Sequence, residues 1–101
     1  MKECCVYWIR EKNHTDVFTQ GYIGITYNFE YRLSQHIGHC ANPKYYKKYR
    51  TAFRDAISSG NYVATKVLIA SREYCFEVEA KLRPDWRIGW NLAKGGNGWL
   101  S

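Results

Sequence analysis

The chain has 101 residues, of which 46% are hydrophobic and 24% charged, and it carries a formal net charge of +6 with a pI near 9.2. This length predicts one domain, residues 1–101, with a core of modest size. The sequence contains no apolar run long enough for a membrane span and no visible secretory leader, so we expect a cytoplasmic protein, or one of the host-cell cytoplasm if a phage encodes it.

The composition also bears on partners and metals. The positive charge and the nine tyrosines favour a polyanionic partner such as nucleic acid. The four cysteines are Cys4, Cys5, Cys40 and Cys75. No Cys-x-x-Cys pair occurs, so reduced, buried thiols are a better interpretation than a zinc site. His36, His39 and Cys40 form a loose cluster, but the adjacency of the last two gives poor ligand geometry.

The first predicted elements form a β-hairpin. Residues 4–10 (CCVYWIR) are rich in strand-forming side chains, and both faces of this strand are largely apolar. A polar, turn-prone stretch over residues 11–16 separates it from a second strand over residues 17–25. A symmetric turn there would place Tyr7 opposite Tyr22, with both side chains on the same face of the sheet.

Two glycines in the second strand point to a close approach. Gly21 and Gly24 flank Tyr22 in the stretch GYIGIT. Glycine inside a strand costs stability, so this pair indicates that another group comes near the backbone. The plainer alternative is a bulge or a tight helix–sheet contact.

A first helix is predicted over residues 29–37, with Asn28 as its N-cap and Gly38 as its stop. Arg32 and His36 are four residues apart and therefore share one side of this helix. Taken singly, each has an ordinary alternative: a solvated arginine and a half-buried helix histidine.

A second helix is predicted between Asn42-Pro43 and Gly60. Its surface is strongly basic and few acidic residues interrupt it, so it can contact phosphates, although an ordinary solvated face is the alternative. The predicted DNA-contacting residues are Lys44, Lys47, Lys48, Arg50, Arg54 and, near the C-terminus, Lys94.

The remaining elements are a third strand over residues 62–70 and a final helix capped by Ser71. Glu79 falls on the apolar face of that helix. A carboxylate in such a position needs an ion-pair or hydrogen-bond partner, or else has a functional role such as metal binding. The structural alternative is a salt bridge to Arg83, or to Arg72 two turns earlier.

The order of these features resembles the GIY-YIG nuclease family, and the resemblance covers nearly the whole chain. The residues that carry it are Val6-Tyr7, Tyr22-Ile23-Gly24, Arg32 and Glu79 on helices, and Asn91-Leu92 followed by Gly95-Gly96. The chain departs from the family in its first motif, where Cys5-Val6-Tyr7 keeps only the tyrosine. The gap between the first two motifs is also longer than in short members, which fits a longer hairpin turn.

The resemblance implies an α+β fold with a three-stranded antiparallel sheet flanked by helices, in the order β-β-α-α-β-α. That order agrees with the elements predicted above. The implied activity is metal-dependent hydrolysis of a DNA phosphodiester. Mg²⁺, or Mn²⁺, would be held by Glu79 and by water, because Mg²⁺ often keeps most of its hydration shell.

The same resemblance implies roles for the other site residues. Arg32 would offer a bidentate contact to the scissile phosphate. Either Tyr7 or His36 would take the proton from the attacking water. Tyr22 would orient water or phosphate, and Asn91 would fix the geometry of the site.

Two alternatives remain at this level. The first is a non-catalytic nucleic-acid-binding module on the same fold, for which the basic helix and the tyrosines would suffice. The second is an interaction protein whose basic surface meets an acidic partner. As a nuclease, so small a chain would take its sequence preference from the catalytic module, from self-association or from a partner protein.

Overall fold

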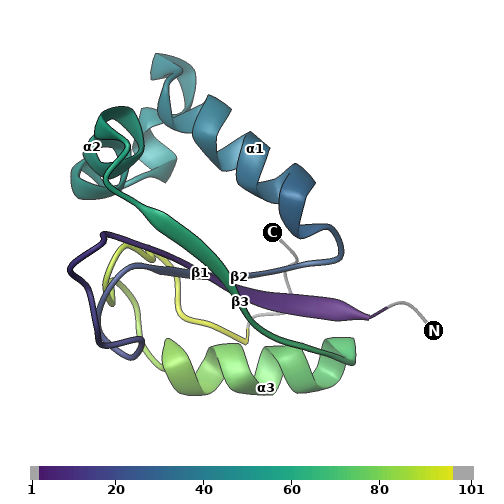
Figure 1. Ribbon diagram of the computed structural model, residues 1–101. Helices are drawn as coiled ribbons and strands as arrows, with labels where there is room; N and C mark the ends of the chain where they lie inside the picture. Colours follow the sequence, from purple (N-terminus) through teal and green to yellow (C-terminus); the bar gives the residue numbers. More distant parts are fainter. Residues whose placement is uncertain (1–2, 97–101) are drawn as a thin grey trace.

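A computed structural model describes residues 3–96 and shows a three-stranded antiparallel sheet with helices on both faces (Figure 1). The strands are β1 (Cys4–Arg10), β2 (Tyr22–Thr26) and β3 (Val63–Ala70). They lie in the order β2-β1-β3, so the first strand is central and the other two form the edges. The predicted fold class is therefore confirmed.

The helices are divided between the two faces of the sheet. Helices α1 (Phe29–Cys40) and α2 (Thr51–Ser59) cover one face, and α3 (Arg72–Leu82) covers the other (Figure 1). A short 3-10 helix, η1 (Pro43–Lys48), lies between α1 and α2 in the chain. No helix among residues 3–96 is long and apolar enough to cross a membrane.

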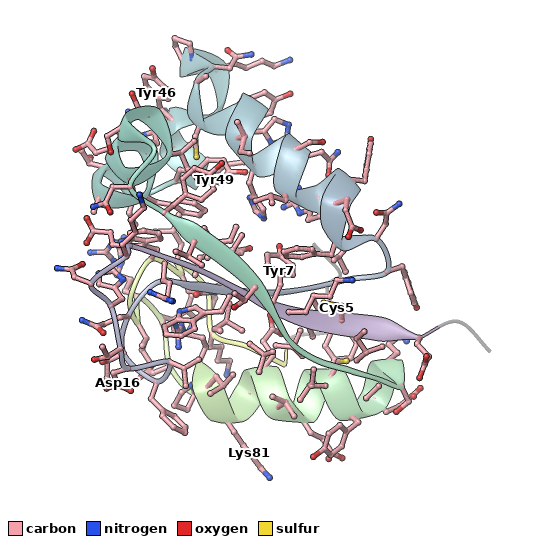
Figure 2. The ribbon with its side chains drawn as sticks, viewed as in Figure 1. Cys5, Tyr7, Asp16, Tyr46, Tyr49 and Lys81 are labelled. Atoms are coloured by element: carbon pink, nitrogen blue, oxygen red, sulfur yellow. The ribbon has the colours of Figure 1, made fainter. Side chains whose placement is uncertain are left out.

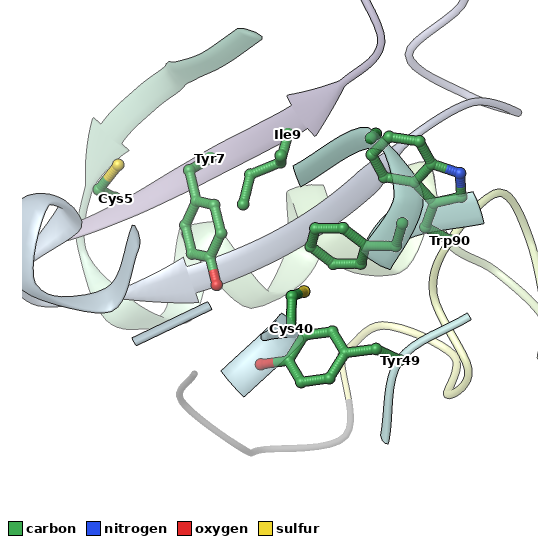
Figure 3. Close-up of a cluster of buried hydrophobic side chains, with 8 residues drawn as sticks. Cys5, Tyr7, Ile9, Cys40, Tyr49 and Trp90 are labelled. Carbon is green, nitrogen blue, oxygen red and sulfur yellow. The ribbon is translucent and has the colours of Figure 1, made fainter. Parts of the chain in front are cut away.

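Alternation along the central strand produces two apolar clusters, because successive side chains of a strand point to opposite faces. The cluster beneath α1 and α2 contains Cys5, Tyr7, Ile9, Cys40, Tyr49, Phe53, Ala56 and Trp90 (Figure 3). The cluster beneath α3 contains Cys4, Val6, Ile23, Ile25, Cys75 and Leu82. The four cysteines are buried and free, as the sequence predicted.

The hairpin register differs from the prediction. Tyr7 pairs with Gly24, and Tyr22 pairs with Ile9. The second strand begins at Tyr22, because Asp16 organises a turn before it by accepting hydrogen bonds from later backbone amides. The register moves by two residues, which preserves the face, so Tyr7 and Tyr22 still lie on the same side of the sheet with ring centroids 6.1 Å apart.

Two helix boundaries also differ. Helix α1 continues through Gly38 to Cys40, and burial of the Cys40 side chain favours this extra turn. The predicted helix between Asn42 and Gly60 is broken in two, because Tyr49 adopts an extended conformation between η1 and α2. This break turns the Tyr49 side chain inward toward the sheet (Figure 2).

Candidate active site

A pocket of about 180 Å³ lies where α1, η1 and the edge strand β2 meet. Its lining consists of Tyr22, Arg32, His36, His39, Lys48 and Tyr49. Among residues 3–96, the lining includes two basic side chains, two imidazoles and two phenols, but no carboxylate. Such a pocket suits a small anionic group with oxygen acceptors, such as a phosphate.

Tyr7 and His36 form a hydrogen-bonded pair at the inner end of this site. Their Oη and Nε2 atoms are 2.7 Å apart. Strand β1 places Tyr7 on the face beneath α1, and the helical spacing that puts His36 on the side of Arg32 also turns it toward the sheet. The sequence left Tyr7 and His36 as alternative bases, and the structure joins them as one unit.

Burial keeps His36 uncharged. Its side chain is almost fully buried, and this burial, followed by the charge of Arg32 and the neighbouring His39, lowers the pKa of His36 from 6.5 to about 3. Both ring nitrogens have partners, because Nδ1 lies 2.9 Å from the Tyr49 hydroxyl. A neutral imidazole donates through one nitrogen and accepts through the other, so His36 connects the two tyrosines.

Arg32 supplies the positive charge of the pocket. Its Nη1 donates to the side-chain oxygen of Gln35 at 3.1 Å. Its Nε is buried and has no hydrogen-bond partner among the described residues. A buried donor without a partner costs free energy, so an anion that accepted from the guanidinium would be bound favourably here.

Tyr49 and His39 complete the site, and the sequence did not predict either of them. Tyr49 falls inside the helix predicted between Asn42-Pro43 and Gly60, and the sequence indicates for His39 only a loose cluster with poor ligand geometry. The Tyr49 hydroxyl lies 3.4 Å from His39 Nδ1. The break before α2 that positions Tyr49 leaves no clear signal in the sequence, since Asn42-Pro43 and Gly60 mark only the outer ends of that region.

Glu79 is buried, as predicted, but it lies on the helix at the other face of the sheet from the pocket (Figure 1). Its carboxylate accepts a hydrogen bond of 2.9 Å from the Gly96 amide. Burial raises the pKa of Glu79 above its usual value, while the Gly96 amide and the charge of Arg83 oppose that rise. Among residues 3–96, no three histidine, cysteine or acidic side chains gather as a metal-binding group.

Asn91 holds the edge of β2 through its side chain. Its Oδ1 accepts from the Ile23 amide at 2.8 Å, and its Nδ2 donates to the Ile23 carbonyl at 2.8 Å. The side chain therefore pairs with the free edge of β2 as a neighbouring strand would. From there the chain runs to Gly96, beside Glu79, so one segment links the β2 edge to α3.

Arg83 is fully buried and holds the same region together. Its guanidinium donates to Asn91 Oδ1 and to four backbone carbonyls, those of Val17, Gln20, Gly21 and Leu82. The alternative in which Arg83 serves mainly as the salt-bridge partner of Glu79 does not describe these contacts. The sequence named Arg83 only as that partner and missed its function in fixing the start of β2.

The predicted DNA-contacting residues are not all in one place. Lys48 lines the pocket, and the ammonium groups of Lys44 and Lys48 both lie within 6 Å of the centre of the Tyr45 ring, at 5.7 and 5.8 Å. Arg54 stacks over Tyr46 at 4.0 Å. The other residues of the prediction are Lys47, which is exposed on η1, Arg50, which precedes α2, and Lys94, which is exposed on the segment beside Glu79.

Comparisons with protein-family models, with curated proteins and with solved structures found no significant match. The functional assignment therefore rests on the residues of this chain and their arrangement.

Proposed function

We propose that this protein is a metal-dependent DNA endonuclease of the GIY-YIG type. The observation that carries the proposal is a pocket lined by Arg32 and His36, with no carboxylate from residues 3–96, in which His36 is hydrogen-bonded to the buried Tyr7. Phosphodiester hydrolysis needs a cation for the phosphate and an acceptor for the proton of the attacking water, and this pocket offers both.

The phosphate would bind to Arg32, with Lys48 beside it. Arginine presents two parallel N–H groups to phosphate oxygens, and this contact strengthens as charge develops on the phosphate during attack. Tyr22 lines the same pocket, and its hydroxyl would orient the water or the phosphate. Tyr7 is fully buried and is hydrogen-bonded to His36 of the pocket lining, so the attacking water would enter the site beside His36.

Tyr7 is the better candidate for contact with the attacking water. Both nitrogens of His36 already bond to tyrosine hydroxyls, so the imidazole acts on the water only through a tyrosine. His36 in turn orients the Tyr7 hydroxyl and can accept its proton.

Glu79 is a single buried carboxylate without a pair of further acidic, histidine or cysteine side chains beside it among residues 3–96. One carboxylate is enough for a hard divalent cation such as Mg²⁺, which keeps most of its hydration shell. Glu79 does not fit an all-protein metal cage. When bound, Mg²⁺ or Mn²⁺ would supply positive charge beside Glu79. The segment from Asn91 to Gly96 connects this carboxylate to the edge of β2, whose first residue, Tyr22, lines the pocket.

The second candidate function is a non-catalytic DNA-binding module. It is favoured by the position of Glu79 on α3, against the face of the sheet opposite the pocket. A binding module needs the basic surface and the phosphate pocket, but it does not need that carboxylate.

Cleavage of supercoiled plasmid with Mg²⁺ or with EDTA distinguishes the two candidates. We expect metal-dependent nicking by the native protein, none by Glu79→Gln, and a loss of about 100-fold in Arg32→Lys because the bidentate contact is lost. Glu79→Gln keeps the side-chain oxygen that accepts from Gly96 and removes a buried charge, so its fold should persist.

Glu77→Gln is the matched control, because Glu77 is an exposed carboxylate on the same helix. It should cleave like the native protein. Retarded DNA without cleavage under either metal would replace the nuclease proposal with the binding module. Full activity of Glu79→Gln would contradict the metal-binding function given to Glu79.

A further inference from the structure

Four titratable side chains form a continuous hydrogen-bonded chain through the layer between the sheet and α1. The Tyr7 hydroxyl is 2.7 Å from His36 Nε2, and His36 Nδ1 is 2.9 Å from the Tyr49 hydroxyl. The Tyr49 hydroxyl is 3.4 Å from His39 Nδ1. We propose that Tyr7, His36, Tyr49 and His39 form a proton relay that carries the proton of the attacking water from Tyr7 to solvent at His39, an inference that rests on the proposed nuclease function.

The relay has a buried end and an open end. Tyr7 and His36 are 0% and 1% exposed, so neither exchanges a proton with bulk solvent directly. His39 is only partly buried and lines the pocket. A proton taken up at Tyr7 therefore needs a route outward, and Tyr49 is the link between the two histidines.

The hydrogen bonds can all point the same way, as proton transfer along a chain requires. In one orientation Tyr7 donates to His36 Nε2, His36 Nδ1–H donates to Tyr49, and Tyr49 donates to His39 Nδ1. Transfer reverses each of these bonds. This use of both ring nitrogens explains why His36 is bonded to a tyrosine on each side.

The step balances in protons and bonds. An O–H bond of water breaks and the proton joins the Tyr7 oxygen, whose own proton moves to His36 Nε2. His36 Nδ1–H passes to Tyr49, the Tyr49 proton passes to His39 Nδ1, and His39 releases its Nε2 proton to solvent. The hydroxide formed attacks phosphorus, and all four side chains end neutral.

The positive charges around the two histidines disfavour the imidazolium form, so a proton that reaches either ring is passed on. Burial first, and then the charge of Arg32, lower the pKa of both histidines below 6.5, and the charge of Lys48 adds to this effect at His39. The aromatic and titratable groups packed against the two rings are Tyr7 on β1, Tyr22 on β2, Tyr45 and Tyr49 around η1, and Phe53 on α2. Within the described part of the chain no carboxylate is among these neighbours, so residues 3–96 supply no counter-ion for an imidazolium at either position.

The first test does not require cleavage. Tyr49→Phe keeps the buried ring and removes the hydroxyl that links the histidines, and NMR of the ring nitrogens is followed as pH is varied. We expect the tautomer of His36 and the titration of His39 to change together in this variant. Tyr62→Phe is the control, because Tyr62 packs against the same apolar cluster and should leave both histidine signals unchanged.

The second test uses the pH profile of plasmid cleavage. At neutral pH we expect Tyr49→Phe to cleave about 100-fold more slowly, within the range that positioned proton transfer contributes, and to recover part of that loss at alkaline pH, where bulk base replaces the relay. His39→Gln alters only the partly exposed end and should show the same profile, which keeps the test valid if Tyr49→Phe misfolds.

The outcomes separate this inference from the proposed function. Unchanged histidine signals in Tyr49→Phe, or cleavage by both variants with the native pH profile, would overturn the relay while leaving the nuclease intact. Absence of cleavage by the native protein would overturn the nuclease, and the NMR measurement would then decide alone whether the four groups are coupled.

Discussion

Gly24 shows how one residue type in the sequence sets the geometry of the site. It pairs with Tyr7 across the β1–β2 ladder, and the Tyr7 ring lies directly over its backbone. A Cβ at this position would overlap the Tyr7 hydroxyl and would lie 2.8 Å from Cε1 of the ring. The two glycines predicted that another group packs closely against the strand backbone. At Gly24 that group is the Tyr7 ring, which fits there because glycine has no side chain.

Gly24→Ala should therefore destabilise the protein by about 1–3 kcal/mol, the usual cost of forcing an extra methyl group into a packed core. It should also displace Tyr7 from His36. The free energy of unfolding in urea measures the first effect.

Gly38→Ala is the comparison for this change, because nothing lies within 4 Å of a Cβ there and the residue is inside α1. This variant should gain about 0.5–1 kcal/mol from the better helix former. Equal stability of the two variants would show that Tyr7 does not depend on Gly24.

At the scale of elements, the edge of β2 is held by side chains from outside the sheet. Asn91 satisfies both backbone groups of Ile23, and Arg83 holds the carbonyls just before β2 begins. Trp90 adds a backbone hydrogen bond of 2.8 Å to the Gly21 carbonyl. An edge strand normally presents unpaired groups to solvent, and here the chain after α3 covers them.

Asn91→Ala should cost about 2–4 kcal/mol, because it leaves both groups of Ile23 and one guanidinium donor of Arg83 without their partner. Amide hydrogen exchange should accelerate in β2, first at Ile23, and remain slow in β3. Chemical denaturation gives the free energy, and exchange gives its location.

Asn61→Ala provides the control, because the exposed Asn61 accepts only a long hydrogen bond of 3.4 Å from the Lys12 amide. Its effect should stay within about 0.5 kcal/mol. Unaltered exchange at Ile23 in Asn91→Ala would contradict the structural function given to Asn91.

For the whole molecule, the two sides of the sheet carry different functional side chains. The pocket, the proposed relay and most of the predicted DNA-contacting side chains lie on the side of the sheet that α1 and α2 cover. On the other side, Lys81 and its acidic neighbours point outward from α3 (Figure 2). The net charge of +6 is thus presented unevenly, and DNA should approach the face that carries η1 and the pocket.

The salt dependence of DNA binding tests this orientation. Each phosphate contact contributes about −0.9 to the slope of log affinity against log salt concentration, so Lys48→Ala should reduce the magnitude of the slope by about that amount. Lys81→Ala removes the same charge from the far face and should leave the slope unchanged. Equal effects of the two variants would contradict a single DNA-facing side.

The sequence predicted most of the elements, since these depend on local chemistry. Caps at Asn28 and Ser71, and the alternating apolar residues of β1, define their elements without help from the rest of the chain. The predictions were wrong where a distant contact decides. Tyr49 breaks a helix that its neighbours favour and bonds to His36, and Arg83 holds the backbone carbonyls of the segment before β2.

By itself, then, the sequence determined the α+β order and the burial of Glu79, because local chemistry defines the elements and helix periodicity fixes which side a residue takes. The shared face of Tyr7 and Tyr22 was predicted from a register that is wrong by two residues, and an even shift preserves the face. Only the tertiary structure decided that His36 is a neutral link between two tyrosines, that Asn91 and Arg83 close the edge of β2, and that Glu79 belongs to the opposite layer. These depend on which elements pack together, and the burial and hydrogen bonds made between elements distant in the chain have no local signature.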